Sequence, residues 1–447
     1  TRYVANQDTL RDIIAYRDTL PRERANSIMY EREADMFGDL SHNEDRDSDL
    51  FEGLLGVTTP GSIVMFRQDE PGRAYAMWGP QASRFLRATL GFEPEELTEE
   101  GAFHLRSYLT EKYGEMSDGE RDSWAKKIDE NGLQTLIDFH KDGADMLGDA
   151  RGWKQYRTTG STSLPASRDY VAQGLGLIAA MMGHPGHHAM VDISHPKHQS
   201  AHQRMSLALQ GVFHGLRSCT LKELKPISKG CLLPGGYGGG KIAIAAKLSD
   251  MEWDEVKGDW NYGEFGDRLP DFNPIIAKML PSGSVEGKMK DLVKLSARFA
   301  RAMHHTFPFL KPFQEQVVRN WTEHRERRVL PTFTTSTGYE IKASPIRMNR
   351  KYTRSVRCRN TTLEGRTIQA QTTIFHHDEN MEGTDWMAKG AFIKDSSIMV
   401  HTGLDLVELG CKNQDHVHDM VRVGFNHMGD LDRAAVRAYN HVMGTSL

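Results

Sequence analysis

The chain has 447 residues, of which 38% are hydrophobic and 26% charged, with a formal net charge of -4. This composition is typical of a globular protein and excludes a disordered chain, and no apolar run reaches the roughly 18 residues that a membrane-spanning helix needs. The four cysteines form no CxxC pair, which argues against a zinc ribbon or a disulfide framework. The first residues lack a basic stretch followed by an apolar core, so we expect no signal peptide and a cytoplasmic protein.

The charge is unevenly distributed along the chain. Residues 1–150 carry 17 Lys and Arg against 31 Asp and Glu, whereas residues 151–447 carry 39 against 29. A basic C-terminal two-thirds can attract a polyanion such as a nucleic acid. Two solvated surfaces of opposite sign would give the same counts.

Hydrophobic periodicity predicts an α+β fold that is mainly helical, with small antiparallel hairpins and no internal repeat. Helices are predicted within residues 8–37, 81–150, 206–216 and 292–320, with a terminal helix pair at 416–443. Strand pairs are predicted at 61–77, at 332–348 around a Ser-Thr-Gly turn, and at 392–409 around a His-Thr-Gly turn.

Two conspicuous local features have ordinary explanations. The glycine-rich stretch 234–241 nearly fits a phosphate-binding loop, but Ile242 stands where that motif needs a hydroxyl, so a glycine-rich turn is favoured. Six histidines between residues 184 and 202 could ligate zinc, but no HExxH motif or carboxylate at ligand spacing accompanies them. A solvated loop that contacts anions is the favoured interpretation.

Several short motifs follow one another in a fixed order. They are Asp69-x-x-Gly72-Arg73; Ser163-Leu164-Pro165-x-x-x-Asp169-x-x-x-x-Gly174; Lys225-x-x-x-Lys229 with Tyr237-Gly238 after it; Phe375-His376-His377-Asp378; and Val400-His401-Thr402-Gly403-Leu404-Asp405. Each is weak alone. Together, over most of the chain, they resemble the single-subunit RNA polymerases of phages and mitochondria.

The resemblance implies a right-hand polymerase fold of palm, fingers and reduced thumb, with a small antiparallel palm sheet. It implies synthesis of RNA on a DNA template from nucleoside triphosphates, with two Mg2+ ions. On this basis residues 1–68 form an N-terminal helical docking segment, and 69–182 begin the palm and carry a helical insertion. Residues 183–330 form the fingers, and 331–447 carry a specificity-type hairpin at 332–348 and the end of the palm.

The resemblance also assigns catalytic roles. Asp169 becomes a metal ligand, followed by the carbonyl of Tyr170, although a carboxylate before a helix is also a common N-cap. Lys229, assisted by Lys225, neutralises the triphosphate, and the spacing of four places both on one helix face. Tyr237 stacks beside the nascent base pair and helps to check the sugar. An exposed basic helix face is the alternative interpretation of the two lysines.

RNA synthesis rather than DNA synthesis is predicted on steric grounds. Related DNA polymerases carry a bulky Glu five residues after the metal-binding aspartate, whereas Gly174 leaves room for a 2′-hydroxyl. His377, or His376 beside it, resembles the histidine that contacts the substrate sugar, unless the two are only a surface pair. The remaining motif, Asp69 with Gly72 and Arg73, resembles the element that contacts the template and hybrid backbone; an Asp–Arg turn that braces a hairpin is the alternative.

One motif departs from the pattern. The family's last palm motif is His-Asp, but here Thr402 follows His401, and its neutral hydroxyl is a poor substitute for a carboxylate. Asp405 is the nearest replacement as second metal ligand, and Asp395 is a weaker one. A DNA polymerase or primase of the same superfamily, and a catalytically inactive nucleic-acid-binding paralogue, therefore remain as alternatives.

The number of residues before Asp69 is also small for the family. We expect a separate small subunit to supply the missing N-terminal domain, with this chain as the catalytic subunit of a heterodimer. The other expected partners are a DNA template, an RNA product and nucleoside triphosphates. A phage-encoded chain would act in the cytoplasm of the infected bacterium.

Overall fold

The computed structural model describes most of the chain. The described residues are 2–19, 55, 59, 66–68, 74–76, 85, 88–139, 141–169, 173–191, 200–254, 258–262, 269–327, 332–336, 338, 340–342, 346–357, 367–377, 383–417 and 420–444. At 66–68, 74–76, 346–357 and 367–377 only the backbone is described. The predicted α+β class, mainly helical with small antiparallel sheets, is confirmed. Within the described ranges, no helix combines the length and apolarity that crossing a membrane requires.

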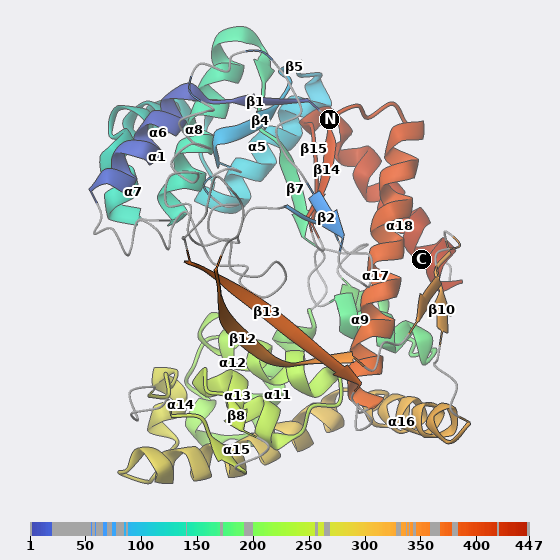
Figure 1. Cartoon of the computed structure of the whole chain (residues 1–447). Coiled ribbons are helices and arrows are strands. Elements are labelled where there is room, and N and C mark those ends of the chain that lie inside the picture. Colours follow the sequence, from blue (N-terminus) through green and yellow to red (C-terminus); the bar gives the residue numbers. More distant parts are fainter. Residues whose placement is uncertain are drawn as a thin grey trace.

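A first group of helices packs around one core (Figure 1). Its elements are β1 (Tyr3–Ala5), α1 (Gln7–Asp18), β4 (Leu90–Phe92), β5 (Glu95–Glu96), α5 (Glu99–Tyr113), α6 (Asp118–Glu130), α7 (Gly132–Phe139), α8 (Lys141–Thr159) and β6 (Ser161–Thr162). Leu10 of α1 is fully buried, and so are Leu105 and Leu109, which are four residues apart on one face of α5. Trp153 of α8 is also fully buried, and its indole N–H donates to Asp122 of α6 over 2.8 Å.

A second group of helices packs around a separate core (Figure 1). Its elements are α9 (Gln173–Met181), α10 (His188–Val191), α11 (Ala201–Val212), the short helix η1 (His214–Leu216), α12 (Leu221–Gly236), α13 (Lys241–Ser249), β8 (Trp253–Asp254), β9 (Asp259–Trp260), α14 (Pro274–Lys278), α15 (Val285–Thr306) and α16 (Leu310–Glu326). Phe299 of α15 is fully buried and meets the ring of Phe213 edge-on, with the centroids 4.9 Å apart.

Local sequence fixes where several of these helices begin. Three of them start with a capping box, in which a Ser or Thr side chain and a Glu or Gln side chain satisfy each other's free backbone N–H groups. The pairs are Ser117 with Glu120 at α6, Ser200 with Gln203 at α11, and Thr220 with Glu223 at α12. The start of α12 matters most here, because this helix carries the two predicted substrate-binding lysines.

A three-stranded antiparallel sheet joins segments that lie far apart in the sequence. It consists of β7 (Ala166–Asp169), β15 (Met420–Val423) and β14 (Gln414–Val417), with β15 in the centre. In Figure 1 the green β7 lies beside the red β14 and β15. The register pairs Met420 with Asp169 at one end and Val423 with Ala166 at the other.

Two long helices lie along this sheet. These are α17 (Gly383–Glu408) and α18 (Met428–Met443), which follows the short helix η2 (Phe425–His427), and they pack against each other. Ile398 of α17 and Tyr439 of α18 share a small core with Leu177 of α9. Helix α9 is thereby tied to both the sheet region and the second helix group.

Small hairpins complete the chain. The predicted strand pair at 61–77 is confirmed as β2 (Phe66–Gln68) with β3 (Ala74–Ala76), and the one at 332–348 as β10 (Thr332–Thr334) with β11 (Glu340–Lys342). Gly338 in the second turn has a φ of 82°, a left-handed conformation that glycine adopts readily. A longer ribbon of β12 (Ile346–Arg357) and β13 (Thr367–His377) crosses between the two helix groups in Figure 1.

Two predictions near the C-terminus are wrong. Residues 392–409 form part of α17 rather than two strands, because Ile398, Thr402 and Leu406 are buried at a spacing of four along one helix face. Gly403 resembled a turn signal, but it lies within the helix, where an added Cβ would approach His416 of β14 to 2.9 Å. The predicted terminal helix pair at 416–443 is strand β15 followed by η2 and one helix, α18.

A buried ion pair lies within the central sheet. Asp415 of β14 and Arg422 of β15 are cross-strand partners, with 4% and 6% of their surface exposed. Arg422 donates two hydrogen bonds to the Asp415 carboxylate, from Nε to Oδ1 over 2.8 Å and from Nη2 to Oδ2. The Tyr3 hydroxyl of β1 donates to Oδ2 over 3.0 Å. Burial and the Asp415 charge raise the pKa of Tyr3, so it remains a donor at any physiological pH.

We expect Arg422→Met to lower the free energy of unfolding by about 3–5 kcal/mol, because it leaves the Asp415 carboxylate buried without its partner. Guanidinium denaturation would measure the change. The double variant Asp415→Leu/Arg422→Met should recover most of the loss, and the control Arg11→Met, which breaks an exposed ion pair with Asp8, should cost less than about 1 kcal/mol. A loss for Arg422→Met as small as that of the control would contradict the structural importance of the pair.

Candidate active site

The end of β7 is the centre of the candidate site. Asp169 is the last residue of this strand, and its backbone pairs with Met420, the first residue of β15. Strands β14 and β15 are joined by only two residues, His418 and Asp419, both outside the described residues. In the sequence, Asp419 directly precedes Met420, the residue that pairs with Asp169.

His418-Asp419 is a His-Asp pair that the sequence reasoning missed. From the sequence, the corresponding motif of the single-subunit RNA polymerases is predicted at 400–402, within an expected hairpin. That hairpin is absent: Thr402 is buried within α17, and its hydroxyl donates to the Ile398 carbonyl over 2.8 Å. Asp405 and Asp395 were predicted as metal ligands because a hairpin would bring them to the site. Both lie on helix α17, so the hairpin does not support this prediction.

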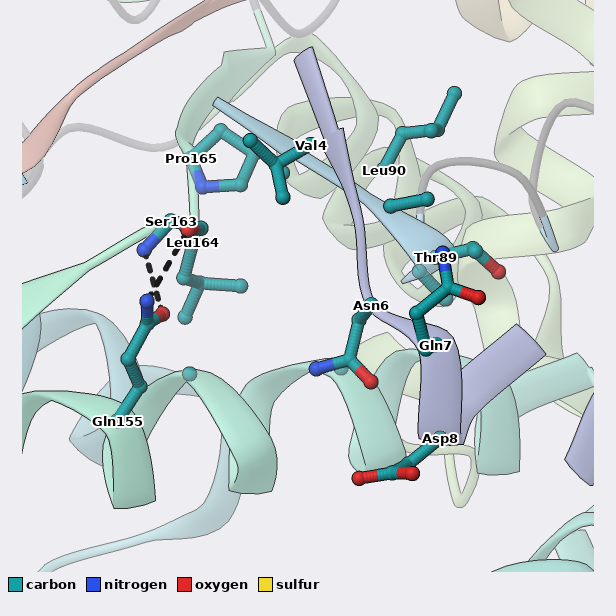
Figure 2. Close-up of a pocket in the computed structure, with 15 residues that line it drawn as sticks. Val4, Asn6, Gln7, Asp8, Thr89, Leu90, Gln155, Ser163, Leu164 and Pro165 are labelled. Atoms are coloured by element: carbon teal, nitrogen blue, oxygen red, sulfur yellow. Dashed lines mark hydrogen bonds between the residues drawn. The ribbon is translucent and has the colours of Figure 1, made fainter. Parts of the chain in front are cut away.

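The segment that leads into β7 is held from both sides (Figure 2). Gln155 of α8 accepts a hydrogen bond from the Ser163 backbone N–H over 2.8 Å and donates to the Ser163 hydroxyl over 3.3 Å. The Ser163 carbonyl accepts from the N–H of Phe92 in β4 over 2.8 Å. A cavity of about 270 Å³ adjoins this segment, and Asp8 is the one charged residue in its lining. The cavity carries no feature that points to a ligand. Its lining includes Ser163, Leu164 and Pro165 of the segment that leads to Asp169.

A further predicted motif reaches the same sheet. Strand β3 begins directly after Arg73 and lies beside β14. Asp69, Gly72 and Arg73 themselves lie outside the described residues, as does Tyr170. Their predicted contacts with template and substrate stay predictions, but the backbone brings β3, the strand that follows the first motif, beside β14 at the edge of the three-stranded sheet.

The two predicted substrate lysines lie on α12. Lys225 and Lys229 are exposed and one turn apart, whereas Leu224, Ile227 and Ser228 are buried against the second core. In the described part of the chain neither lysine forms an ion pair with a carboxylate. The two lysines therefore lie on one exposed face of α12, as predicted.

His202 of α11 lies near Lys225 and Lys229, a proximity that the sequence did not reveal. Its Nδ1 atom is buried and has no hydrogen-bond partner among the described residues. Burial, and then the charges of Lys225 and Lys229, lower its pKa to about 4. The sequence showed only a cluster of histidines; the packing of α11 on α12, where Ser206 and Ser228 share a 2.7 Å hydrogen bond, brings this one to the lysines.

Tyr237 and Gly174 meet although 63 positions separate them. Tyr237 caps the C-terminal end of α12, and its ring contacts Phe392 of α17 with centroids 5.5 Å apart. A Cβ atom at Gly174, on α9, would overlap the Tyr237 hydroxyl, and one at Gly236 would approach Leu175 to 2.7 Å. The end of α12 therefore lies directly on the start of α9, five residues beyond Asp169.

The remaining predicted site residues are placed only in part. His377 is the last residue of β13, where its backbone pairs with Ile346, and its side chain is not described. Asp405 is half-buried on α17. Burial and the charge of His441 lower the pKa of His401 on the same helix, and the Asp405 charge only partly opposes this. No three His, Cys, Asp or Glu side chains converge as metal ligands within the portion whose side chains are described, which leaves out Asp169 and Asp419.

No known family model matches the chain, and no curated protein matches it in sequence.

The contact between Gly174 and Tyr237 predicts a mutational coupling. Gly174→Ala should lower the free energy of unfolding by about 1 kcal/mol, because the new methyl group must displace the tyrosine ring. In a Tyr237→Phe background the same substitution should cost much less. Thermal or chemical denaturation of the four variants would measure the coupling.

Gly211→Ala on α11 is the matched control, because a Cβ there meets open space and Ala favours a helix. It should leave stability unchanged or slightly higher. If Gly174→Ala lowered the free energy of unfolding equally with and without the Tyr237 hydroxyl, the two residues would not be in contact.

Proposed function

We propose that this chain catalyses DNA-templated RNA synthesis, as the catalytic subunit of a phage-type RNA polymerase. The three-stranded sheet would be the palm, the second helix group the fingers, and the thumb would be reduced. The observation that carries the proposal is the convergence of three separate motifs. Asp169 ends a strand in register with the residue after His418-Asp419, and five residues later Gly174 contacts Tyr237 at the end of the lysine helix.

The residues at the sheet end suit Mg2+. This ion takes hard oxygen ligands, and one or two carboxylates with water suffice. Asp169 and Asp419 would hold it. Bound there, it would supply Lewis-acid activation of the RNA 3′-hydroxyl and neutralise charge on the phosphates. The His-Asp pair at 418–419 would supply the carboxylate that Thr402 lacks, which supports the catalytic proposal over the inactive paralogue.

The lysine helix would bind the triphosphate. Lys225 and Lys229 are exposed and form no ion pair with a carboxylate among the described residues. Cations placed against a transferring phosphoryl group stabilise the charge that develops on it. His202 beside them is neutral near pH 7 because its pKa is about 4. It therefore offers a hydrogen bond to a phosphate oxygen without adding to the repulsion between the lysines.

Sugar selection would take place where α9 meets α12. The Tyr237 hydroxyl lies where a side chain at Gly174 would begin, so it would be the polar group nearest a ribose 2′-hydroxyl at this point. A bulky Glu at position 174, as in the DNA polymerase alternative, would displace this tyrosine. His377 as the contact to the 2′-hydroxyl stays a prediction.

The long ribbon supports binding of a nucleic acid. Strand β12 contains five Lys or Arg residues, and neither β12 nor β13 contains Asp or Glu. By the register, including the irregularity between Met348 and Arg350, positions 347, 350 and 354 share a face of the ribbon, and all three are Arg. Such a basic ribbon fits the phosphate backbone of DNA or an RNA–DNA hybrid. A separate small subunit is the further proposed partner.

The proposal is tested by extension of an RNA primer on single-stranded DNA with Mg2+ and the four ribonucleoside triphosphates. Asp169→Asn and Asp419→Asn should each abolish extension while leaving template binding nearly intact, because each removes a ligand charge without changing shape. Asp405→Asn on α17 is the matched control and should remain active.

Extension that survives in Asp169→Asn or Asp419→Asn would contradict the metal assignment. Loss of extension in Asp405→Asn alone would indicate that Asp405, and not Asp419, is the second metal ligand. Faster extension with deoxyribonucleotides than with ribonucleotides would favour the DNA polymerase alternative.

Binding of a triphosphate should also be linked to proton uptake. The pKa of His202 is about 4 in the free chain, lowered first by burial and then by the two lysines. An anion that neutralises the lysines removes the second effect and should raise the pKa part of the way toward its ordinary value near 6.5. Between these two values the bound state holds more protons, so affinity should rise as pH falls from 7 toward 5. Calorimetry at pH 5.5 in buffers of different ionisation enthalpy would count the protons.

His202→Gln should take up fewer protons than the parent chain by up to one per nucleotide bound. His214→Gln, which changes an exposed histidine of η1, is the control and should behave as the parent. Equal proton uptake by all three chains would exclude His202 from the triphosphate site.

A further inference from the structure

The C-terminal end of α12 carries backbone carbonyls that the helix itself cannot satisfy. Two of them accept hydrogen bonds within the following turn: Gly235 from the N–H of Gly238 over 3.2 Å, and Pro234 from the N–H of Gly239 over 2.8 Å. Gln314 of α16 adds a contact from outside. Its amide nitrogen donates to the Gly235 carbonyl over 2.9 Å and lies 3.4 Å from the Gly236 carbonyl.

The orientation of the Gln314 amide is fixed by a second residue. The ring nitrogen Nε2 of His304 on α15 lies 3.2 Å from the Gln314 side-chain oxygen. A donor at that oxygen directs the amide nitrogen toward the two glycine carbonyls, because the two ends of an amide have opposite hydrogen-bonding roles. His304, Gln314 and the end of α12 thus form one chain of hydrogen bonds across three helices.

The packing around this contact leaves little freedom. A Cβ at Gly235 would approach Met303 of α15 to 2.7 Å, and one at Gly236 would approach Leu175 of α9 equally closely. The carbonyl of Gly236 belongs to the same planar peptide group as the N–H of Tyr237. Fixing that group therefore fixes where the Tyr237 side chain starts.

We propose that Gln314 is a positioning residue for the choice between ribonucleotide and deoxyribonucleotide substrates. It acts through Tyr237, whose hydroxyl lies against Gly174 at the place where the sugar would bind. The inference rests on the proposed function. A small rotation of the Gly236–Tyr237 peptide is amplified along the tyrosine side chain, so the space left for a 2′-hydroxyl changes although Gln314 itself does not touch the substrate.

The test uses Gln314→Glu, which keeps the side-chain shape but replaces the amide donor with an acceptor that faces the glycine carbonyls. Primer extension would give kcat/KM separately for a ribonucleotide and its 2′-deoxy analogue. We expect the ratio of the two to fall by about tenfold or more, since misplacement of a site residue by an ångström has effects of this size. Tyr237→Phe should change the same ratio.

Gln210→Glu is the matched control. Gln210 of α11 likewise donates to a backbone carbonyl, that of Cys219, over 2.6 Å within the second helix group. It should lower the thermal unfolding midpoint about as much as Gln314→Glu does but leave the substrate ratio unchanged. Gln314→His, which retains a donor, should give a kcat/KM ratio between those of Gln314→Glu and the parent chain.

The possible outcomes separate the two proposals. An altered ratio in Tyr237→Phe with an unaltered one in Gln314→Glu would overturn the role of Gln314 alone. An equal change in Gln210→Glu would show a general structural effect and would also overturn it. A parent chain that extends no primer would contradict the proposed function and the selection step with it.

Discussion

The buried ion pair between Asp415 and Arg422 fixes the register of the sheet on which the candidate site depends. A slip of one residue between β14 and β15 would invert the faces of the strands and separate two buried charges, at a cost of several kcal/mol. Strand β15 also pairs with β7, and this second register sets Asp169 opposite Met420. Tyr3 extends the constraint to β1 and so to the first helix group.

Close approach of helices provides the second constraint. Gly174, Gly235 and Gly236 each lie where an added Cβ would collide with a neighbouring helix. The absence of side chains at these positions lets α9, α12 and α15 meet, and the meeting point carries Tyr237. The sheet therefore fixes the end of the candidate site at β7, and the glycine contacts fix the end at α12, with only the segment from Asp169 to Gly174 between them.

Much of this arrangement could be predicted from local patterns. The Gly338 turn and the spacing of Lys225 and Lys229 act over a few residues, and the sequence indicated the hairpin and the shared helix face correctly. The capping box at Ser200 starts α11 five residues before the helix predicted at 206–216. Helix α17 was missed because its His-Thr-Gly stretch resembles a turn, and only the packing of His416 against Gly403 explains a glycine there. The contacts of His202 and Gln314 depend on helices brought together by the fold, for which short-range spacing holds no signal.

The most direct test of the account replaces Mg2+ with Fe2+ in the presence of primer, template and a nucleotide, and maps where hydroxyl radicals cut the polypeptide. A metal held by Asp169 and Asp419 predicts two cuts, one near each of these residues, both suppressed by excess Mg2+. Cutting near Asp405 without cutting near Asp419 would contradict the account.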